Sequence, residues 1–333
     1  AVECRIRKAT YGTVVINSSP SPAQVMQDDR ILGQTPITLR RVKAGPFSFD
    51  VRYPGYKSET IKGVLKEGGS PVFTVRLKNI RAVIYGKPWT NTLQMNLVPL
   101  GQAMISATEV RRRDFREFAR ERKLTPLPEW QLDDESKLDL PITSVTRAEA
   151  SSFCEWLTQR EQGQEIIDGN HSYRLPYDDE WSMAAGMPRE KGAAPADRHL
   201  RAEGMYPWGY VWPPPPGVAN LFDKSASGAD NTRPPVPSYD DGFAEISPVD
   251  ALPPNERGLR SLSGNVWEWV AEDYGGEFAP LASHGTVRGG AFTTSAREQL
   301  LSGYRRAVPP GERHKDVGFR ILLSAGAPAR VGE

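Results

Sequence analysis

The chain has 333 residues, with 42 Lys and Arg against 41 Asp and Glu, and a formal net charge of +1. This balance excludes an overall basic field that would attract nucleic acid or an anionic membrane. The length predicts two domains, and no apolar run approaches the roughly 20 residues that cross a bilayer. No signal peptide is visible in the sequence, and the polar start at Ala1 is as expected of a processed or trimmed product whose upstream targeting segment is missing.

The first 80 residues predict a small antiparallel β-sandwich. Short runs of β-branched and aromatic residues are separated by Gly, Pro, Ser and Asp clusters, which is typical of strands joined by tight turns. The runs occupy residues 13–16, 24–26, 37–39, 47–53 and 72–77. Residues 81–87 are predicted to be a connection, since Pro88 disfavours helix before it.

From residue 88 to residue 325 the pattern indicates an α+β domain with long irregular stretches, followed by a tail over 326–333. Helices are predicted over 109–123, over 147–160 and from about Tyr177. The arginine run 111–113 precedes acidic residues, so we expect it on a solvated helix face. Residues 186–260 are rich in proline and poor in periodicity, which is unusual unless ions or a binding function hold the backbone.

The short sequence motifs of the first domain resemble those of the PEGA domain over roughly residues 10–78. The matching phrases, in order, are 17–20, 23–25, 33–36, 44–45 and 54–56, and Pro22 stands where the family usually has Gly. The resemblance implies a small β-sandwich without catalysis that acts as a spacer or docking module. It also implies an extracytoplasmic location, in the bacterial periplasm or at the cell surface.

The second domain carries short sequence motifs whose order resembles that of the sulfatase-modifying-factor family. They are 109–110, 174–176, 180–181, 207–209, 219–220, 241–243, 247–249, 258–259, 264–269, 288–290 and 318–320. The resemblance implies the loop-rich formylglycine-generating-enzyme fold, which is related to the C-type lectin fold. Arg174, Arg288 and Arg320 are expected to anchor loop carbonyls or carboxylates through their planar guanidinium groups.

Active members of that family use a cysteine pair a few residues after the Arg-Gly-Gly phrase, where aerobic enzymes bind Cu(I). By resemblance, these positions fall at about Thr294 and Gln299. A hydroxyl and an amide cannot replace soft, redox-active thiolates, so we expect no copper and no family activity. The surrounding surface, with Thr294, Gln299, Arg297, Tyr304 and Arg305, is the expected ligand groove, and the stretch 297–306 should lie near it.

The remaining sulfur and imidazole groups predict no catalytic site. Cys154 recurs with apolar neighbours at helical spacing and is expected to be a core residue, while Cys4 has no interpretable context. The four histidines, at 171, 199, 284 and 314, are scattered and lack ligand spacing. A facial triad assembled in space from distant residues remains an alternative.

Calcium is the metal that the resemblance implies. One site would use the Asn220 and Asp241 side chains with the carbonyls of Leu221 and Phe243, oxygen ligands of the kind that Ca²⁺ prefers. A second, weaker site would use Ser261, carbonyls near Leu262, Gly264 and Val266, and Glu268. It is weakened because Ser261 stands where the family has Asp or Asn.

These observations predict a non-catalytic bacterial protein that binds a protein, peptide or glycan, or that serves as an accessory subunit of an assembly or membrane complex. One alternative is a metal-dependent oxidase of the non-haem iron type, which requires at least two histidines and a carboxylate converging in a pocket. Another is the sensor portion of a larger membrane kinase. No nucleic-acid partner is expected.

Overall fold

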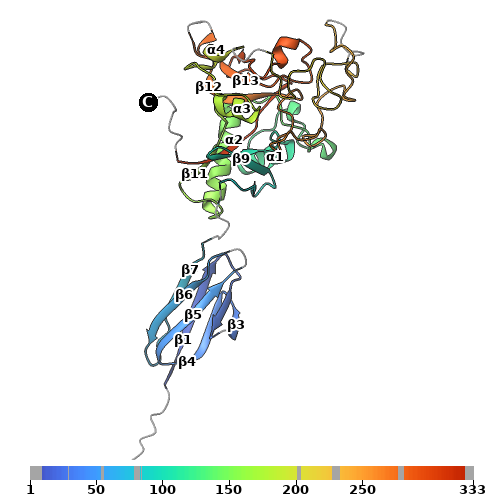
Figure 1. Ribbon diagram of the computed structural model, residues 1–333. Coiled ribbons are helices and arrows are strands. Elements are labelled where there is room, and N and C mark those ends of the chain that lie inside the picture. The colour runs from blue at the N-terminus through green and yellow to red at the C-terminus, as the bar shows by residue number, and fades with distance from the viewer. Residues whose placement is uncertain are drawn as a thin grey trace, which may run out of the picture. The chain divides into compact units, whose positions relative to one another are not determined.

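The computed structural model describes residues 10–28, 30–53, 56–78, 83, 85–200, 204–226, 233–276 and 281–326. Cys4 and the tail beyond residue 326 lie outside this range. The chain divides into two compact units, residues 1–83 and 84–333, at a point inside the predicted connection 81–87. Figure 1 draws the chain of both units as a ribbon. Each unit has a hydrophobic core of its own.

The N-terminal unit is a sandwich of two sheets. One sheet has three strands, in the order β4 (Ile37–Lys43), β1 (Tyr11–Ser19) and β7 (Val72–Arg76). The other has four strands, in the order β3 (Arg30–Gln34), β2 (Gln24–Gln27), β5 (Gly45–Arg52) and β6 (Glu59–Leu65). The sandwich is thus formed by the five predicted strands and by two further ones.

Alternation of side chains explains the core of this sandwich. In β5, Phe47, Phe49 and Val51 are buried while the residues between them are exposed or half-buried, as expected of a strand with one face on a core. Val14 and Ile16 of β1 contribute from the other sheet. The purely antiparallel expectation is wrong at one point, because β1 and β7 pair in parallel.

The C-terminal unit is a mixed α+β fold built on two small sheets. The five-stranded sheet has the order β11 (His171–Arg174), β16 (Leu322–Ala325), β10 (Ala103–Ser106), β9 (Asn96–Leu100) and β8 (Trp89–Thr90). The four-stranded sheet has the order β14 (Arg306–Val308), β13 (Gly285–Arg288), β12 (Trp267–Asp273) and β15 (Val317–Gly318).

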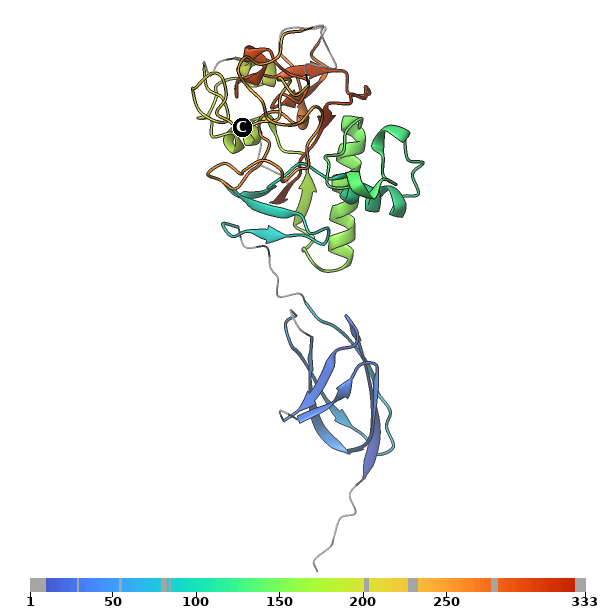
Figure 2. The same ribbon diagram turned by 90° about the vertical axis from the view of Figure 1, so that its right-hand side faces the viewer.

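Four α-helices and three 3₁₀-helices flank these sheets in the part of the chain that the structure describes. They are α1 (Arg112–Glu121), α2 (Arg147–Gly163), α3 (Asp178–Ala184), α4 (Pro195–Arg198), η1 (Pro128–Trp130), η2 (Glu135–Lys137) and η4 (Arg297–Leu300). Figure 2 shows α1 beside α2. Phe115 and Phe118 of α1 pack there against Phe153 and Trp156 of α2, with ring centroids 5.6–6.0 Å apart.

The first predicted helix needs two corrections. It begins at Arg112 and not at 109, because Arg111 is extended and its backbone N–H donates to the Asp114 carboxylate as a cap. The solvated-face expectation is wrong for Arg112, which is only 4% exposed. Its guanidinium donates to Gln131 Oε1 at 2.5 Å.

Between α4 and β12, the described residues form isolated bridges in place of helices and strands. One parallel bridge joins Asn220 to Gly264. A Cβ atom on Gly264, whose φ is +76°, would lie 2.0 Å from the Asn220 carbonyl oxygen. Only glycine allows this approach, which brings the Asn220 loop against the start of the Trp-rich strand β12.

Among the described residues, no helix has both the length and the apolar character needed to cross a membrane.

Candidate functional site

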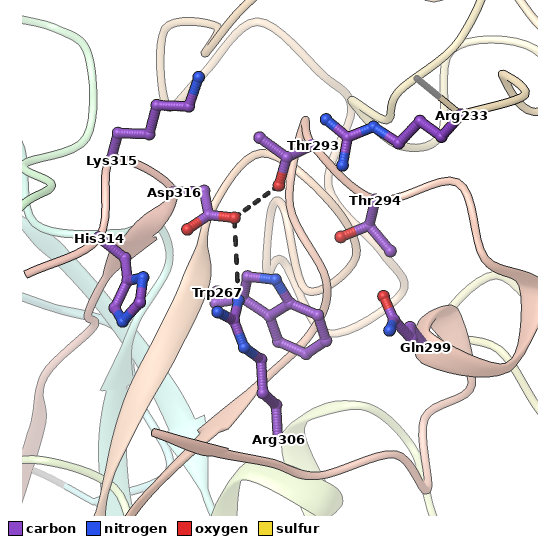
Figure 3. A pocket seen from close by; sticks show the side chains of 9 residues that line it. All are labelled: Arg233, Trp267, Thr293, Thr294, Gln299, Arg306, His314, Lys315 and Asp316. Carbon is purple, nitrogen blue, oxygen red and sulfur yellow. Dashed lines mark hydrogen bonds and ion pairs between the residues drawn. The ribbon is translucent and has the colours of Figure 1, made fainter. Parts of the chain in front are cut away.

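A cavity of about 360 Å³ opens beside the four-stranded sheet of the C-terminal unit, β14-β13-β12-β15 (Figure 3). We call it the basic cavity. It is lined by Arg233, Trp267, Thr293, Thr294, Gln299, Arg306, His314, Lys315 and Asp316. Both positions that resemble the family's cysteine sites, Thr294 and Gln299, therefore lie in its wall.

The four-stranded sheet brings distant segments together around this cavity. Trp267 begins β12, and it pairs in parallel with Val317 of β15, directly after Asp316. Arg306 begins β14 and pairs with Val287 of β13. The turn after β13 supplies Thr293 and Thr294, and η4 supplies Gln299.

Thr294 is fixed by the turn that carries it. Thr294 is only 4% exposed, and its hydroxyl oxygen accepts a hydrogen bond from the Ala291 backbone N–H at 3.1 Å. Its carbonyl oxygen accepts from the backbone N–H of Phe222 at 3.1 Å. The wall at this position is thus a rigid hydroxyl without redox chemistry.

Cationic groups outnumber carboxylates in the cavity wall. Arg233, Arg306 and Lys315 are cations, whereas Asp316 is the single carboxylate among the lining residues. Asp316 Oδ2 accepts a hydrogen bond from the Thr293 hydroxyl at 2.5 Å and lies 3.8 Å from Arg306 Nη1. The Arg306 guanidinium also lies over the Trp267 ring, 5.7 Å from its centroid. Lys315 lines the cavity and is exposed to solvent.

The other three predicted groove residues do not line the cavity. Arg297 donates to the Tyr206 hydroxyl at 2.7 Å. Tyr304 packs between Trp267 and His199, with ring centroids at 5.9 and 4.8 Å. Sequence reasoning did not single out Trp267, Lys315 and Asp316 as groove residues, because they come from segments that the sheet brings near Thr294. Thr293, the direct chain neighbour of Thr294, was also not singled out.

The groove assignment is wrong for Arg305, which belongs to a buried ion-pair cluster. Its side chain has no exposed surface, and its Nη2 lies 2.9 Å from Asp178 Oδ2. Arg288 donates to the other oxygen of the same carboxylate, and Glu190 accepts from Arg305 at 2.5 Å. Burial raises the pKa of Asp178, but Arg288 and Arg305 outweigh burial and hold that pKa below its ordinary value.

The three arginines of the family phrases do anchor loops, as predicted. Arg174 forms two hydrogen bonds of 2.7 Å with the Glu180 carboxylate. Arg288 donates to the carbonyl oxygens of Ser302 and Tyr304. Arg320 donates to the carbonyl oxygen of Ser106 at 3.1 Å.

The residues expected at the first calcium site fit an oxygen-binding cation. Asn220 is fully buried, and its Oδ1 has no hydrogen-bond partner among the described residues, whereas its Nδ2 donates to the Glu245 carbonyl oxygen. Asp241 Oδ2 accepts from the Leu221 N–H at 2.7 Å, and Asp241 Oδ1 accepts from the Phe243 N–H at 2.8 Å.

A second carboxylate, which sequence reasoning missed, lies beside Asp241. Asp223 is fully buried, and its Oδ2 accepts from the Asp241 backbone N–H at 2.5 Å. Burial, together with the negative charge of Asp223, raises the pKa of Asp241 to about 6. A divalent cation would remove the repulsion between two neighbouring carboxylates, so this group has the charge and the unpaired oxygen that calcium requires.

The residues of the second expected calcium site do not fit a cation. Both oxygens of Glu268 accept hydrogen bonds of 2.6 Å from Arg320, and Oε2 also accepts from Trp181 Nε1. Arg320 already supplies the positive charge that an ion would supply. Ser261 lines a different cavity, and Gly264 is engaged with the Asn220 backbone. We therefore derive no calcium chemistry from this set.

The histidines do not converge. His171 Nδ1 lies 2.6 Å from Asp168 Oδ1, and His314 Nε2 lies 3.1 Å from Glu312 Oε2. His199 Nδ1 accepts a hydrogen bond from the backbone N–H of Arg305. No group of three or more His, Cys, Asp or Glu side chains that could hold a metal ion occurs within the described ranges. The iron-oxidase alternative requires such a group, so its structural expectation is wrong for this part of the chain.

Cys154 is a core residue of α2, as predicted. It is 1% exposed, and burial raises the pKa of its thiol well above the ordinary value. A neutral buried thiol is neither a nucleophile nor a ligand for a soft metal.

Comparison with known proteins agrees with this architecture. The model of the sulfatase-modifying factor enzyme 1-like domain matches residues 66–325, and the PEGA domain model matches residues 11–80. The structure of PvdO from Pseudomonas aeruginosa covers 72% of this chain and 99% of its own, with a TM-score of 0.50 and 16% identity. That likeness concerns the fold alone.

Of two curated relatives, one is named as an inactive protein and the other as an enzyme. The mouse (Mus musculus) protein named inactive C-alpha-formylglycine-generating enzyme 2 is 31% identical over 198 residues, which cover 58% of this chain and 52% of the relative. The formylglycine-generating enzyme of Thermomonospora curvata is 27% identical over 199 residues, 54% of each chain. The chain therefore spans about half the length of each.

Proposed function

The chain belongs to the sulfatase-modifying factor family, and we propose that it is a non-catalytic member whose basic cavity receives an acidic segment of a protein partner. One observation carries this proposal: the cavity wall presents Thr294 and Gln299 at the positions that resemble the family's cysteines, and none of its described lining residues carries sulfur. The similarity to a relative named inactive supports the same direction.

The cysteine inventory supports the loss of the family chemistry. The chain has two cysteines in total. Cys154 is buried in α2, where its pKa is raised, so it is unavailable to the cavity. A two-thiolate Cu(I) site therefore cannot form there, because at most one thiol remains.

The charge of the cavity supports an acidic partner. Arg306 and Lys315 in the wall outnumber the Asp316 carboxylate, which leaves an excess of positive charge without counting Arg233. Arg306 is one-third exposed, and Lys315 is exposed, so both cations are accessible. Complementary charge favours carboxylate-bearing partners and disfavours basic ones.

The N-terminal unit supports a role in an assembly. Its PEGA match and small sandwich core suit a spacer or docking module outside the cytoplasm, in the periplasm or at the cell surface. In this proposal the sandwich attaches the protein to a larger complex, while the second unit binds the partner.

Calcium is part of the proposal as a structural ion. The side chains of Asn220, Asp223 and Asp241, with backbone carbonyls of the same loops, would hold it. Bound there, the ion would supply charge neutralisation and cross-link loops whose described residues form no helix or strand.

A charge-reversal experiment tests the binding proposal. A fluorescein-labelled hexaglutamate peptide is titrated with the full chain, and binding is followed by fluorescence anisotropy at low and physiological salt. We expect Lys315→Glu to weaken binding about tenfold, since a cation of the cavity lining becomes an anion. Lys191→Glu, an equal charge change at an exposed lysine outside the cavity lining, is the matched control.

The expected pattern is specific. Wild-type protein and Lys191→Glu should bind hexaglutamate alike, and a hexalysine peptide should not bind. Binding should weaken as salt is raised. Equal affinities for Lys315→Glu and Lys191→Glu, or no binding of the acidic peptide at low salt, would refute the assignment of an acidic partner to this cavity.

A further inference from the structure

A second cavity lies in the same unit and shares no lining residue with the basic cavity. We call it the aromatic cavity. It has a volume of about 620 Å³, inside the range of roughly 300–1,000 Å³ that is usual for small-molecule sites. The lining residues that matter here are Tyr206, Trp208, Glu256, Arg257, Ser261 and Ser263.

Tyr206 and Trp208, which line this cavity, belong to an aromatic stack that continues behind them to Trp212. The Trp208 ring is parallel to Tyr206, with centroids 4.8 Å apart, and Tyr206 stacks in turn on Trp212 at 5.6 Å. Arg297 Nε donates a hydrogen bond of 2.7 Å to the Tyr206 hydroxyl oxygen, and the Arg297 guanidinium lies over the Trp212 ring. Because Tyr206 covers one face of Trp208, a ligand in the cavity can meet that indole only through its opposite face or its edge.

Ser263, another lining residue of this cavity, carries a buried hydroxyl without a partner in the part of the chain that the structure describes. Ser263 is 3% exposed, and its Oγ makes no hydrogen bond with any described residue. A buried hydroxyl that is left unpaired costs on the order of 1–3 kcal/mol of stability. A ligand that hydrogen-bonds to Ser263 would recover this cost, so the unpaired hydroxyl indicates a polar ligand.

Charged groups of both signs stand at the mouth. Glu256 and Arg257 are exposed neighbours on the chain that line the cavity. Their charges cancel, so the site favours neither an anion nor a cation. A neutral ligand with many donors and acceptors can use a carboxylate and a guanidinium at once.

We propose that the aromatic cavity binds a neutral sugar ring. A pyranose has an apolar face of C–H groups, which suits the Trp208 face, and a rim of hydroxyls, which suits Ser263, Glu256 and Arg257. An apolar ligand would leave Ser263 unpaired, and a charged ligand would meet one like charge at the mouth. This combination of an aromatic platform and neutral polar groups selects the sugar.

The test uses the full chain and a panel of neutral sugars, namely glucose, galactose, mannose, N-acetylglucosamine and their β-linked disaccharides. Binding is followed by saturation-transfer NMR and tryptophan fluorescence up to about 10 mM, where a site with a Kd of ~1 mM is nearly saturated. We expect saturable binding of at least one sugar, lost in Trp208→Ala and weakened about tenfold or more in Ser263→Ala.

Ser263→Ala separates binding from folding. Removing an unpaired buried hydroxyl should leave stability unchanged or slightly higher, while sugar affinity falls. Ser324→Ala is the matched control, because Ser324 is also buried with an unpaired Oγ but lines neither cavity. We expect Ser324→Ala to bind sugar as the wild type does.

Two results would overturn the proposal. One is that no sugar of the panel binds at the highest concentration. The other is that Ser263→Ala and Ser324→Ala bind sugar equally well. A proline-rich peptide is included, and its binding in place of every sugar also counts against the proposal. Lys315 lies in the other cavity, so Lys315→Glu should not alter sugar binding. Because the two cavities are tested separately, the absence of sugar binding would not contradict the acidic-partner proposal.

Discussion

The Asp178 carboxylate at the start of α3 is bound to Arg305, with Oδ2 2.9 Å from Nη2, and neither side chain has any exposed surface. Arg288 and Arg198 bind the same carboxylate. Three guanidinium groups from distant segments thus meet at one anion, which ties α3 and α4 to the four-stranded sheet that carries the basic cavity.

Removing this carboxylate should destabilise the C-terminal unit strongly. Asp178→Asn leaves the buried guanidinium of Arg288 without its counter-charge and that of Arg305 with Glu190 alone, and breaking a buried pair in this way costs about 3–5 kcal/mol. Urea unfolding measures the loss. Asp179→Asn, the exposed neighbour on the same helix, is the control and should change stability by less than about 0.5 kcal/mol. Similar stabilities for the two variants would contradict the account.

The same carboxylate predicts an acid sensitivity. Because the pKa of Asp178 is lower in the folded than in the unfolded chain, its contribution is present above the unfolded pKa of about 4 and is lost as pH falls below it. Unfolding free energies measured from pH 6 downward should therefore fall more steeply for the wild type than for Asp178→Asn. Parallel curves would show that the ion cluster does not set the acid limit.

Glu109 predicts a pH effect of the opposite sign. Burial raises its pKa to about 8, and its Oε1 accepts a hydrogen bond from Asn265 Nδ2 at 2.9 Å. A raised folded pKa gives a contribution that is complete below the unfolded pKa of about 4 and is lost as pH rises to about 8. Glu109→Gln keeps the oxygen acceptor and removes the titration.

Urea unfolding at pH 5 and pH 8 tests this expectation. The stability of Glu109→Gln relative to the wild type should increase from pH 5 to pH 8. The exposed Glu155→Gln on α2 serves as the control and should show no such trend. A difference between Glu109→Gln and the wild type that does not vary with pH would show that Glu109 is ionised in the folded protein throughout.

Calcium should stabilise the protein through the Asn220 loop. Calcium at 100 times its Kd would add about 2.7 kcal/mol and raise the melting temperature measurably. Asp241→Asn keeps side-chain oxygen but removes a charge, so the calcium-dependent shift should be much smaller. Asp240→Asn, at the exposed adjacent residue, should retain the full shift. Calcium shifts that are equal in both variants, or absent from the wild type, would refute the site.

The fold was predictable because its signals are local or ordered along the chain. Alternation predicted the core strands of the sandwich, and the phrase series predicted the second unit. Strand β3 was missed because its residues are half-buried or exposed, so no core-facing alternation marks it. The parallel pairing of β1 with β7 joins residues some 57 positions apart, as in Val15 with Val72, and no turn signal encodes it.

The candidate site was predictable only in part, as two neighbouring arginines show. Arg305 faces the buried carboxylate of Asp178, whereas Arg306 faces the basic cavity and Asp316. Alternation along an extended segment separates them, but the sequence does not say which of the two faces inward. Glu268 likewise could not be assigned to Arg320 in place of calcium until the fold brought positions 268 and 320 together.

The most direct test of the central claim is mass spectrometry of a cysteine-containing target peptide after incubation with the purified chain, Cu(I) and oxygen. An active formylglycine-generating enzyme serves as the positive control. The account predicts that the peptide thiol stays unconverted, because the basic cavity offers a hydroxyl and an amide and no thiolate pair. Enzyme-dependent conversion of the thiol to an aldehyde by this chain would contradict it.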